Sequence, residues 1–87
     1  MREYSRHCVE VFFENQGQLF DRPVAASMEE AEEFLTDCMA VVAGSLKEVR
    51  DYLDDAGMDI EGMSLKELEE IEEVFPLGDG TYLIVEA

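Results

Sequence analysis

The 87-residue chain has few basic residues, a single histidine and no tryptophan. Six Lys and Arg side chains stand against 22 Asp and Glu, so the formal net charge is −16. Nucleic acids and anionic membrane surfaces repel such a chain, which argues against direct binding to either. The charge is compatible with a basic protein partner or with divalent cations.

Long hydrophobic runs and a secretory leader are also missing. No apolar stretch approaches the roughly 20 residues of a membrane-spanning helix. The first residues lack a basic segment followed by an apolar one. We therefore expect a cytoplasmic protein without membrane contact. Cys8 and Cys38 do not form a C-x-x-C pair and have apolar neighbours, which favours buried free thiols over a disulfide or a reactive thiol.

The patterns of common catalytic and cofactor sites are absent as well. His7 has no partner at the spacing of a metal or acid–base site, and no serine lies in a G-x-S-x-G motif. The "GDG" at 78–80 lacks the lysine and the following helix of a phosphate loop. Counted from Asp55, Ile60 and Lys66 occupy positions where a calcium loop needs Gly and Glu. The sequence predicts no enzyme, no cofactor and no metal centre.

What is present fits one domain over residues 1–87 with a modest core. Hydrophobic residues recur at helical spacing over roughly residues 3–20, where they include Tyr4, Cys8 and Phe12. A strand is disfavoured because alternation would put Phe12 on the same face as acidic side chains. Pro23 ends this first helix.

Three S-x-x-E motifs predict three further helix starts. Their serines are Ser27, Ser45 and Ser64, and the last two open the repeated tetrapeptide "SLKE". Because the sequences after the two copies diverge, the repeat indicates helix caps and not a duplicated unit. The predicted helices run from Ser27 through Val42 to an end at Gly44, over 46–56 with Gly57 closing the helix, and over about 65–73.

The last residues change period. The "GDG" between two apolar runs predicts a β-hairpin with strands near 74–77 and 81–86, and Pro76 confines the first strand to a sheet edge. The expected fold is α+β and mainly α, with three to four helices and a C-terminal β-hairpin.

Three segments carry a resemblance to known sequences: "CVEVFFENQGQLFDRPVA", "EEAEEFLTDCMAVV" and "VFPLGDGTYLIVEA". Together they resemble a set of short acidic bacterial proteins of unknown function, some of which are described as glyoxalase-like. This chain has one histidine and too few predicted strands for a glyoxalase site. In size and charge it is also similar to small acidic phage inhibitors of nucleases. The resemblance implies a bacterial cytoplasmic protein and assigns no functional residue.

The acidic residues are unevenly distributed along the sequence. Residues 27–73 hold sixteen acids and three bases, a net charge of −13, whereas residues 1–26 have a net charge of −1. Glu69 would face Glu72 and Glu73 on the predicted last helix, and such like-charge pairs cost stability. Either the charge serves solubility alone, or a basic partner neutralises it.

We expect a non-enzymatic interaction module that binds a basic protein surface. It would act as a nucleic-acid mimic or inhibitor of a nuclease or DNA-binding protein. The expected contact residues form one acidic face: Glu29, Glu30, Glu32, Glu33, Glu67, Glu69, Glu70, Glu72 and Glu73. The alternative is a housekeeping protein with one of two other roles. One is weak divalent-cation binding by Asp54, Asp55, Asp59 and Glu61. The other is a homodimer that buries Met28, Met58 and Met63.

Overall fold

The computed structural model describes residues 4–86. Along the chain these form α1 (Arg6–Asn15), the 3₁₀ turn η1 (Gln16–Gln18), α2 (Met28–Asp37), β1 (Val41–Ala43), α3 (Leu46–Asp55), α4 (Leu65–Glu69), β2 (Val74–Pro76) and β3 (Tyr82–Ile84). The predicted α+β, mainly α fold with its C-terminal hairpin is confirmed.

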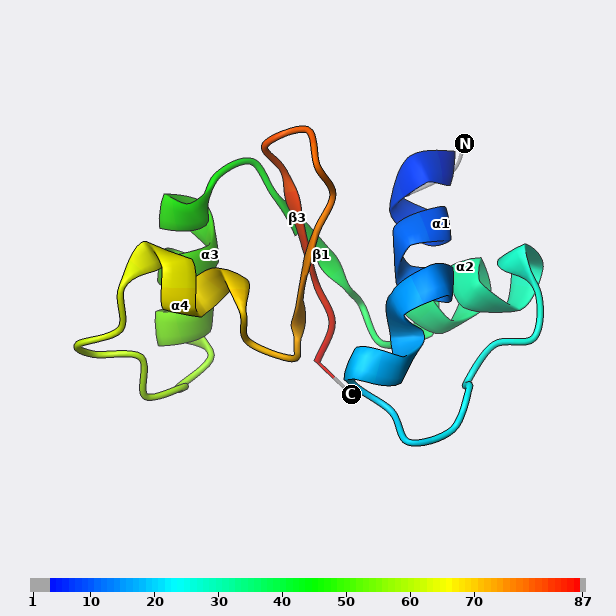
Figure 1. The fold of residues 1–87 in the computed structure, drawn as a ribbon, viewed down its shortest axis with the longest axis horizontal. Coiled ribbons are helices and arrows are strands. Elements are labelled where there is room, and N and C mark those ends of the chain that lie inside the picture. The colour runs from blue at the N-terminus through cyan, green and yellow to red at the C-terminus, as the bar shows by residue number, and fades with distance from the viewer. Residues whose placement is uncertain (1–3, 87) are drawn as a thin grey trace.

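The elements form three layers (Figure 1). A small antiparallel sheet of order β1-β3-β2 lies between the pair α1 and α2 and the pair α3 and α4. Successive side chains of a strand point to opposite faces. Leu83 and Val85 accordingly pack with the first pair of helices, whereas Ile84 packs with the second. Each face of the sheet therefore has its own hydrophobic core.

Serine caps begin all four α-helices. Ser27, Ser45 and Ser64 each accept a hydrogen bond from the backbone N–H three residues on, as predicted, and Ser5 caps α1 in the same way. Only at Ser64 does the glutamate complete a capping box, through a 3.1 Å bond from the Ser64 N–H to Glu67. At the other two predicted caps the glutamate accepts from the residue before the serine.

The prediction that the second helix continues to Gly44 is wrong. It ends at Asp37, and Met39 adopts a left-handed conformation with φ of 55°. The Ala40 N–H then donates to the Leu35 carbonyl and the Met39 N–H to the Thr36 carbonyl. This is a Schellman ending in which methionine replaces the usual glycine. The β-branched residues that follow become strand β1, because they pair with β3.

The other boundaries differ less. The first predicted helix is α1 with its extension η1, and its residue Glu3 lies outside the described residues. Gly57, with φ of 85°, closes α3 as predicted, and β2 with Pro76 is an edge strand. The predicted helix over 65–73 is too long, since α4 ends at Glu69. Mutual repulsion of the glutamates disfavours a longer helix, and the Val74 N–H turns back to the Ile71 carbonyl at 2.9 Å.

Candidate functional site

The nine predicted contact residues do not form one face. Four lie on α2, and we call them the α2 acidic group: Glu29, Glu30, Glu32 and Glu33. Five lie on α4 or directly after it, and we call them the α4 acidic group: Glu67, Glu69, Glu70, Glu72 and Glu73. The two helices belong to the two outer layers, on opposite sides of the sheet (Figure 1). The predicted surface is therefore two separate acidic surfaces.

The α2 acidic group is partly structural. Glu30 accepts a 2.9 Å hydrogen bond from the Ala26 N–H and so stabilises the start of α2. Glu32 and Glu33 line a shallow hollow of about 340 Å³ together with Thr36 and Asp37. None of the described residues that line this hollow is hydrophobic, so a ligand would find mainly charged and polar groups there.

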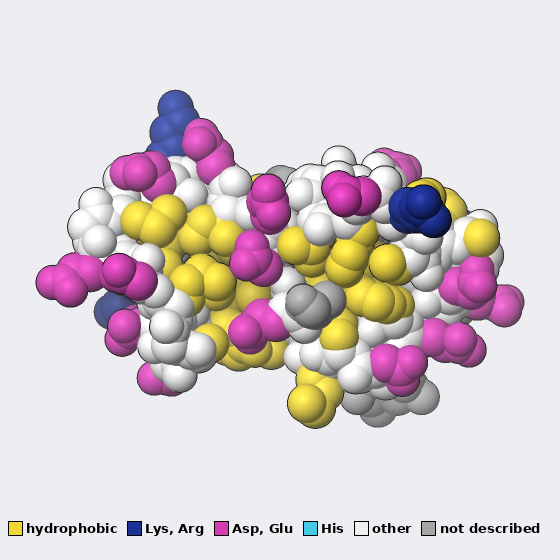
Figure 2. All heavy atoms as spheres, turned by 90° about the horizontal axis from the view of Figure 1, so that it is seen from below, with side chains coloured by type: hydrophobic (Ala, Val, Ile, Leu, Met, Phe, Trp, Pro, Cys, Tyr) yellow, Lys and Arg dark blue, Asp and Glu magenta, His cyan; other side chains and the backbone are white. Residues whose placement is uncertain are grey.

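The α4 acidic group adjoins apolar surface. Glu72 and Glu73 line a shallow hollow of about 430 Å³ with Glu86, Leu19 and Met58. Three carboxylates from two segments thus meet two apolar side chains. Figure 2 shows a face on which acidic side chains lie between two areas of hydrophobic side chains.

Hydrogen bonds to the backbone hold the segment that carries Glu72 and Glu73. The Val85 N–H donates to the Glu73 carbonyl at 2.8 Å, which extends the β2–β3 ladder by one pair. The Gln18 side-chain amide donates to the carbonyls of Glu72 and Val74, each at 3.0 Å. Glu72 and Glu73 lie outside the helix, so their positions are set by these hydrogen bonds and not by helical spacing.

Glu86 has a neighbour with an altered acidity. The hydrogen bond between the Tyr52 hydroxyl and the Glu86 carboxylate raises the pKa of Tyr52 above its ordinary value, and burial raises it further. The sequence did not indicate that Glu86 and Leu19 line the hollow beside Glu72 and Glu73. The period-two pattern of the last strand could have placed Glu86 at a sheet end, but nothing local indicates its approach to Glu72 and Glu73.

Few of the carboxylates have a cation beside them. Within residues 4–86 the structure contains one ion pair in which both partners are described residues. It joins Arg6 to Glu10 at 3.1 Å and is exposed. The Arg50 guanidinium donates instead to the Met63 carbonyl at 3.0 Å. The surplus of negative charge therefore stays largely uncompensated within the described part of the chain.

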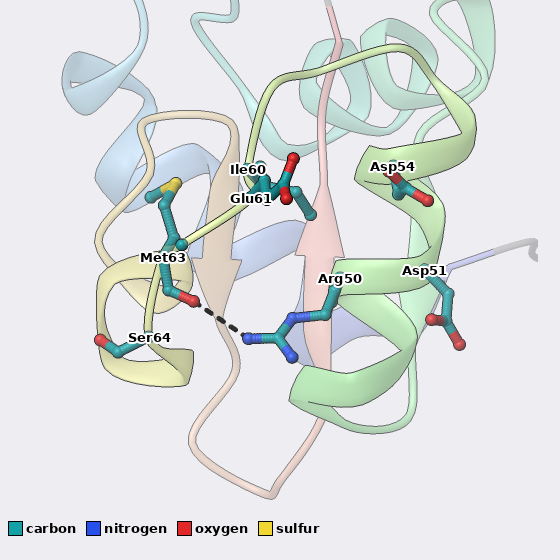
Figure 3. Close-up of a pocket in the computed structure, with 8 residues that line it drawn as sticks. Arg50, Asp51, Asp54, Ile60, Glu61, Met63 and Ser64 are labelled. Carbon is teal, nitrogen blue, oxygen red and sulfur yellow. Dashed lines mark hydrogen bonds between the residues drawn. The ribbon is translucent and has the colours of Figure 1, made fainter.

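The predicted cation-binding residues do not converge. A hollow of about 550 Å³ between α3 and the segment before α4 is lined by Asp54 and Glu61 but by neither Asp55 nor Asp59. Figure 3 shows the Arg50 side chain reaching across it toward Met63. In the part of the chain that the structure describes, no group of three His, Cys, Asp or Glu side chains is arranged to hold a metal ion.

His7 and the cysteines have structural surroundings. An imidazole nitrogen of His7 hydrogen-bonds to the Leu77 carbonyl, which ties α1 to the hairpin. Both cysteines are free thiols. Cys8 is buried, and desolvation raises the pKa of its thiol from 9.0 to about 11, while Cys38 is half-buried with a pKa that is also raised by desolvation. Neither thiol is activated as a nucleophile would be.

Hydrogen bonds from Thr81 lower the pKa of the exposed Asp79 carboxyl in the hairpin turn. The turn needs glycine at Gly78 and Gly80, where φ is 83° and 90°. The predicted "GDG" turn is thus a structural element that holds β2 against β3.

Among residues 4–86 there is no helix with the length and hydrophobicity to cross a membrane. No protein-family model matches the chain. No curated protein and no solved structure is significantly similar to it. These comparisons assign neither a family nor a role to any residue, so the function has to be argued from the two acidic surfaces and their surroundings.

Proposed function

We propose that this chain is a non-enzymatic, cytoplasmic interaction module that binds a basic protein surface through its α4 acidic group. One observation carries the proposal. The chain has 22 acidic residues, and a single ion pair joins two of the residues in 4–86. Self-repulsion of this size lowers the stability of the folded chain, and a basic partner would relieve it.

The surroundings of the α4 acidic group favour it over the α2 acidic group. Lys and Arg side chains combine a charged head with an aliphatic stem. The hollow beside Glu72 and Glu73 offers carboxylates for the head and the apolar Leu19 and Met58 for the stem. The described residues that line the hollow on α2 include no apolar side chain. Glu30 of the α2 acidic group is already engaged with the helix start.

A narrower form of the proposal is that the partner is a nuclease or another DNA-binding protein, for which the acidic surface substitutes for nucleic acid. A groove that neutralises phosphates with Lys and Arg also attracts carboxylates. In that case double-stranded DNA competes with the chain and releases the captured partner. If DNA leaves the complex intact, the partner is a basic protein that binds the chain outside any nucleic-acid groove.

The test is capture of partners by the tagged chain from lysate of its source organism, followed by washes of rising salt and mass spectrometry. Binding between an acidic and a basic surface weakens as salt screens the charges. We expect one basic protein, retained at low salt and released stepwise. If no protein is retained at any salt, or if retention is insensitive to salt, the proposal is wrong and the charge serves solubility.

A further inference from the structure

The two edges of the three-stranded sheet differ in the backbone groups that they leave open. On the β2 edge the Val74 N–H donates to the Ile71 carbonyl at 2.9 Å, and the Val74 carbonyl accepts from the Gln18 side chain at 3.0 Å. Pro76 has no N–H to donate. An added strand would therefore find no free backbone donor on either residue of this edge.

The direction of the backbone groups on β3 follows from its ladder with β2. In this ladder the Val85 N–H donates to Glu73 at 2.8 Å and the Leu77 N–H to Thr81 at 3.0 Å. Hydrogen-bonded pairs alternate along an antiparallel ladder. Leu83, halfway between these two pairs, therefore directs its backbone N–H and C=O toward β2.

The β1 edge is open at Val42. Tyr82 and Ile84 direct their backbone groups toward β1, where their partners in register are Ala43 and Val41. Val42 lies between these two, so its N–H and C=O point away from the sheet. Among residues 4–86 no hydrogen bond to either group is present. An added strand would find one donor and one acceptor here.

Apolar surface lies beside this open position. Val42 pairs directly with Leu83, so its side chain lies on the face of the sheet that α1 and α2 cover. Val42 is 45% exposed and Met39 is 77% exposed, and both line a shallow hollow of about 390 Å³. This apolar hollow can take an apolar side chain from an added strand.

Negative charge lies at each end of the apolar hollow. At the start of β1, Thr36 lines both this hollow and the acidic hollow that contains Asp37. At the end of β1, the Gly44 N–H donates to the Glu48 carboxylate at 2.6 Å, so that this carboxylate lies on the sheet edge. Asp37 and Glu48 are both exposed. The edge thus combines one open backbone position, an apolar hollow and flanking carboxylates.

We propose that an extended basic segment of another protein adds to the β1 edge as a fourth strand. An apolar residue of this segment exchanges two backbone hydrogen bonds with Val42 and packs its side chain in the apolar hollow. A Lys or Arg two residues away on one side lies beside Asp37, and a Lys or Arg two residues away on the other side meets Glu48. The segment therefore has the pattern basic–x–apolar–x–basic.

Charge complementarity identifies the segment as basic. A second copy of this chain, with net charge −16, would bring its own carboxylates against those of the edge. A segment with Lys or Arg at both ends neutralises them. The β1 edge contains no member of the α4 acidic group, so this binding goes beyond the proposed function and does not depend on it.

An NMR titration of the whole isotope-labelled chain tests the pairing, with the acetylated and amidated peptide Lys-Thr-Val-Thr-Lys as the probe. The control peptide has N-methylvaline at its centre. It keeps the charge of the probe and lacks the N–H that donates to the Val42 carbonyl. Any attraction of either peptide to the other acidic residues is the same, so a difference between the two peptides reports on strand pairing.

We expect the probe, at millimolar concentration, to shift the amide signals of Met39, Val42 and Gly44 until they saturate. The control peptide should leave these signals near their free positions. The proposal is overturned if the probe does not shift them, or if the control peptide shifts them as much as the probe does.

A second comparison uses the chain itself. Val42→Pro removes the outward N–H without removing a ladder bond, so the probe should no longer shift Met39 and Gly44. The matched control Leu65→Pro should bind the probe as the wild type does. Leu65 is 46% exposed and is the first residue of α4, a position that accepts proline. Unchanged binding by folded Val42→Pro would also overturn the proposal.

The role of charge is tested by two variants that lose the same charge. Asp37→Asn with Glu48→Gln should weaken binding of the probe several-fold, because each removes one partner of an exposed ion pair. Glu69→Gln with Glu70→Gln in the α4 acidic group should leave it unchanged. Equal weakening by both variants would contradict the assignment of Asp37 and Glu48. Because these readings come from the β1 edge alone, a failure here is distinguishable from a failure of the proposed function.

Discussion

The two helical layers cover the two faces of one sheet with cores of different character. Between α1, α2 and the sheet the core is aromatic: Phe12 stacks on Phe34 with ring centroids 5.6 Å apart and meets Phe75 edge-on at 5.5 Å. Between α3, α4 and the sheet the buried side chains are aliphatic, among them Leu53 and Leu68.

The two acidic groups also differ, because the helices that carry them differ in length. The α2 acidic group lies on a helix of ten residues, whereas much of the α4 acidic group lies after a helix of five. The segment after α4 is held by a glutamine from the other layer, Gln18, and by a ladder bond to Glu73. Where the short helix α4 ends, these polar contacts hold the chain in place. They also position the carboxylates of the proposed site.

The largest expected effect compares how much each of the two cores contributes to the free energy of unfolding. Phe12→Ala removes a fully buried ring from the aromatic core and should cost about 4 kcal/mol of unfolding free energy. Leu68→Ala in the aliphatic core should cost about 3 kcal/mol. Urea unfolding measures both. If Leu68→Ala destabilises the chain more than Phe12→Ala, the aromatic core is not the stronger of the two.

A smaller effect compares two glutamine tethers. Gln16 is buried, and its side-chain amide makes four hydrogen bonds. Three of them hold the segment after η1, two of these at the backbone of Ala25 and one at the Val24 N–H, and the fourth goes to the Phe13 carbonyl. Gln16→Ala leaves buried groups unpaired and should cost about 2–3 kcal/mol. Gln18→Ala, at an exposed position, should cost about 1 kcal/mol or less. Equal losses in urea unfolding would show that burial does not distinguish the tethers.

The smallest effect compares two helix ends of the same type. The left-handed position after α2 holds Met39, whereas the corresponding position after α3 holds Gly57. Met39→Gly should stabilise the chain by about 1 kcal/mol, and Gly57→Ala should destabilise it by about 1 kcal/mol. For a domain of this size that is a shift in Tm of about 4–8 °C in opposite directions. A lower Tm for Met39→Gly would contradict this account of the end of α2.

Features set by local chemistry were predictable from the sequence. The serines at 27, 45 and 64 cap helices because their hydroxyls reach a backbone N–H three residues on, and Gly57 and the "GDG" turn provide positive φ. The hairpin and the edge position of Pro76 follow from the same local chemistry.

Features set by distant contacts were not predictable. The pair Val41 and Val42 fits helical spacing, and only pairing with Leu83 and Ile84, some forty residues later, makes it a strand. Helical spacing also cannot tell on which side of a sheet a helix packs. The nine glutamates were therefore predicted as one surface, although α2 and α4 lie in different layers.

The central claim is that the α4 acidic group binds a basic partner. It is tested by comparing two variants that lose the same charge. One changes Glu69, Glu70, Glu72 and Glu73 to Gln. The other changes Glu14, Glu29 and Glu33 to Gln and Asp37 to Asn, all exposed in the α1–α2 layer. Circular dichroism confirms that both are folded. Capture of the partner from lysate at low salt should be lost with the first variant and retained with the second. Equal retention by both variants, or equal loss, would show that the α4 acidic group is not the binding surface.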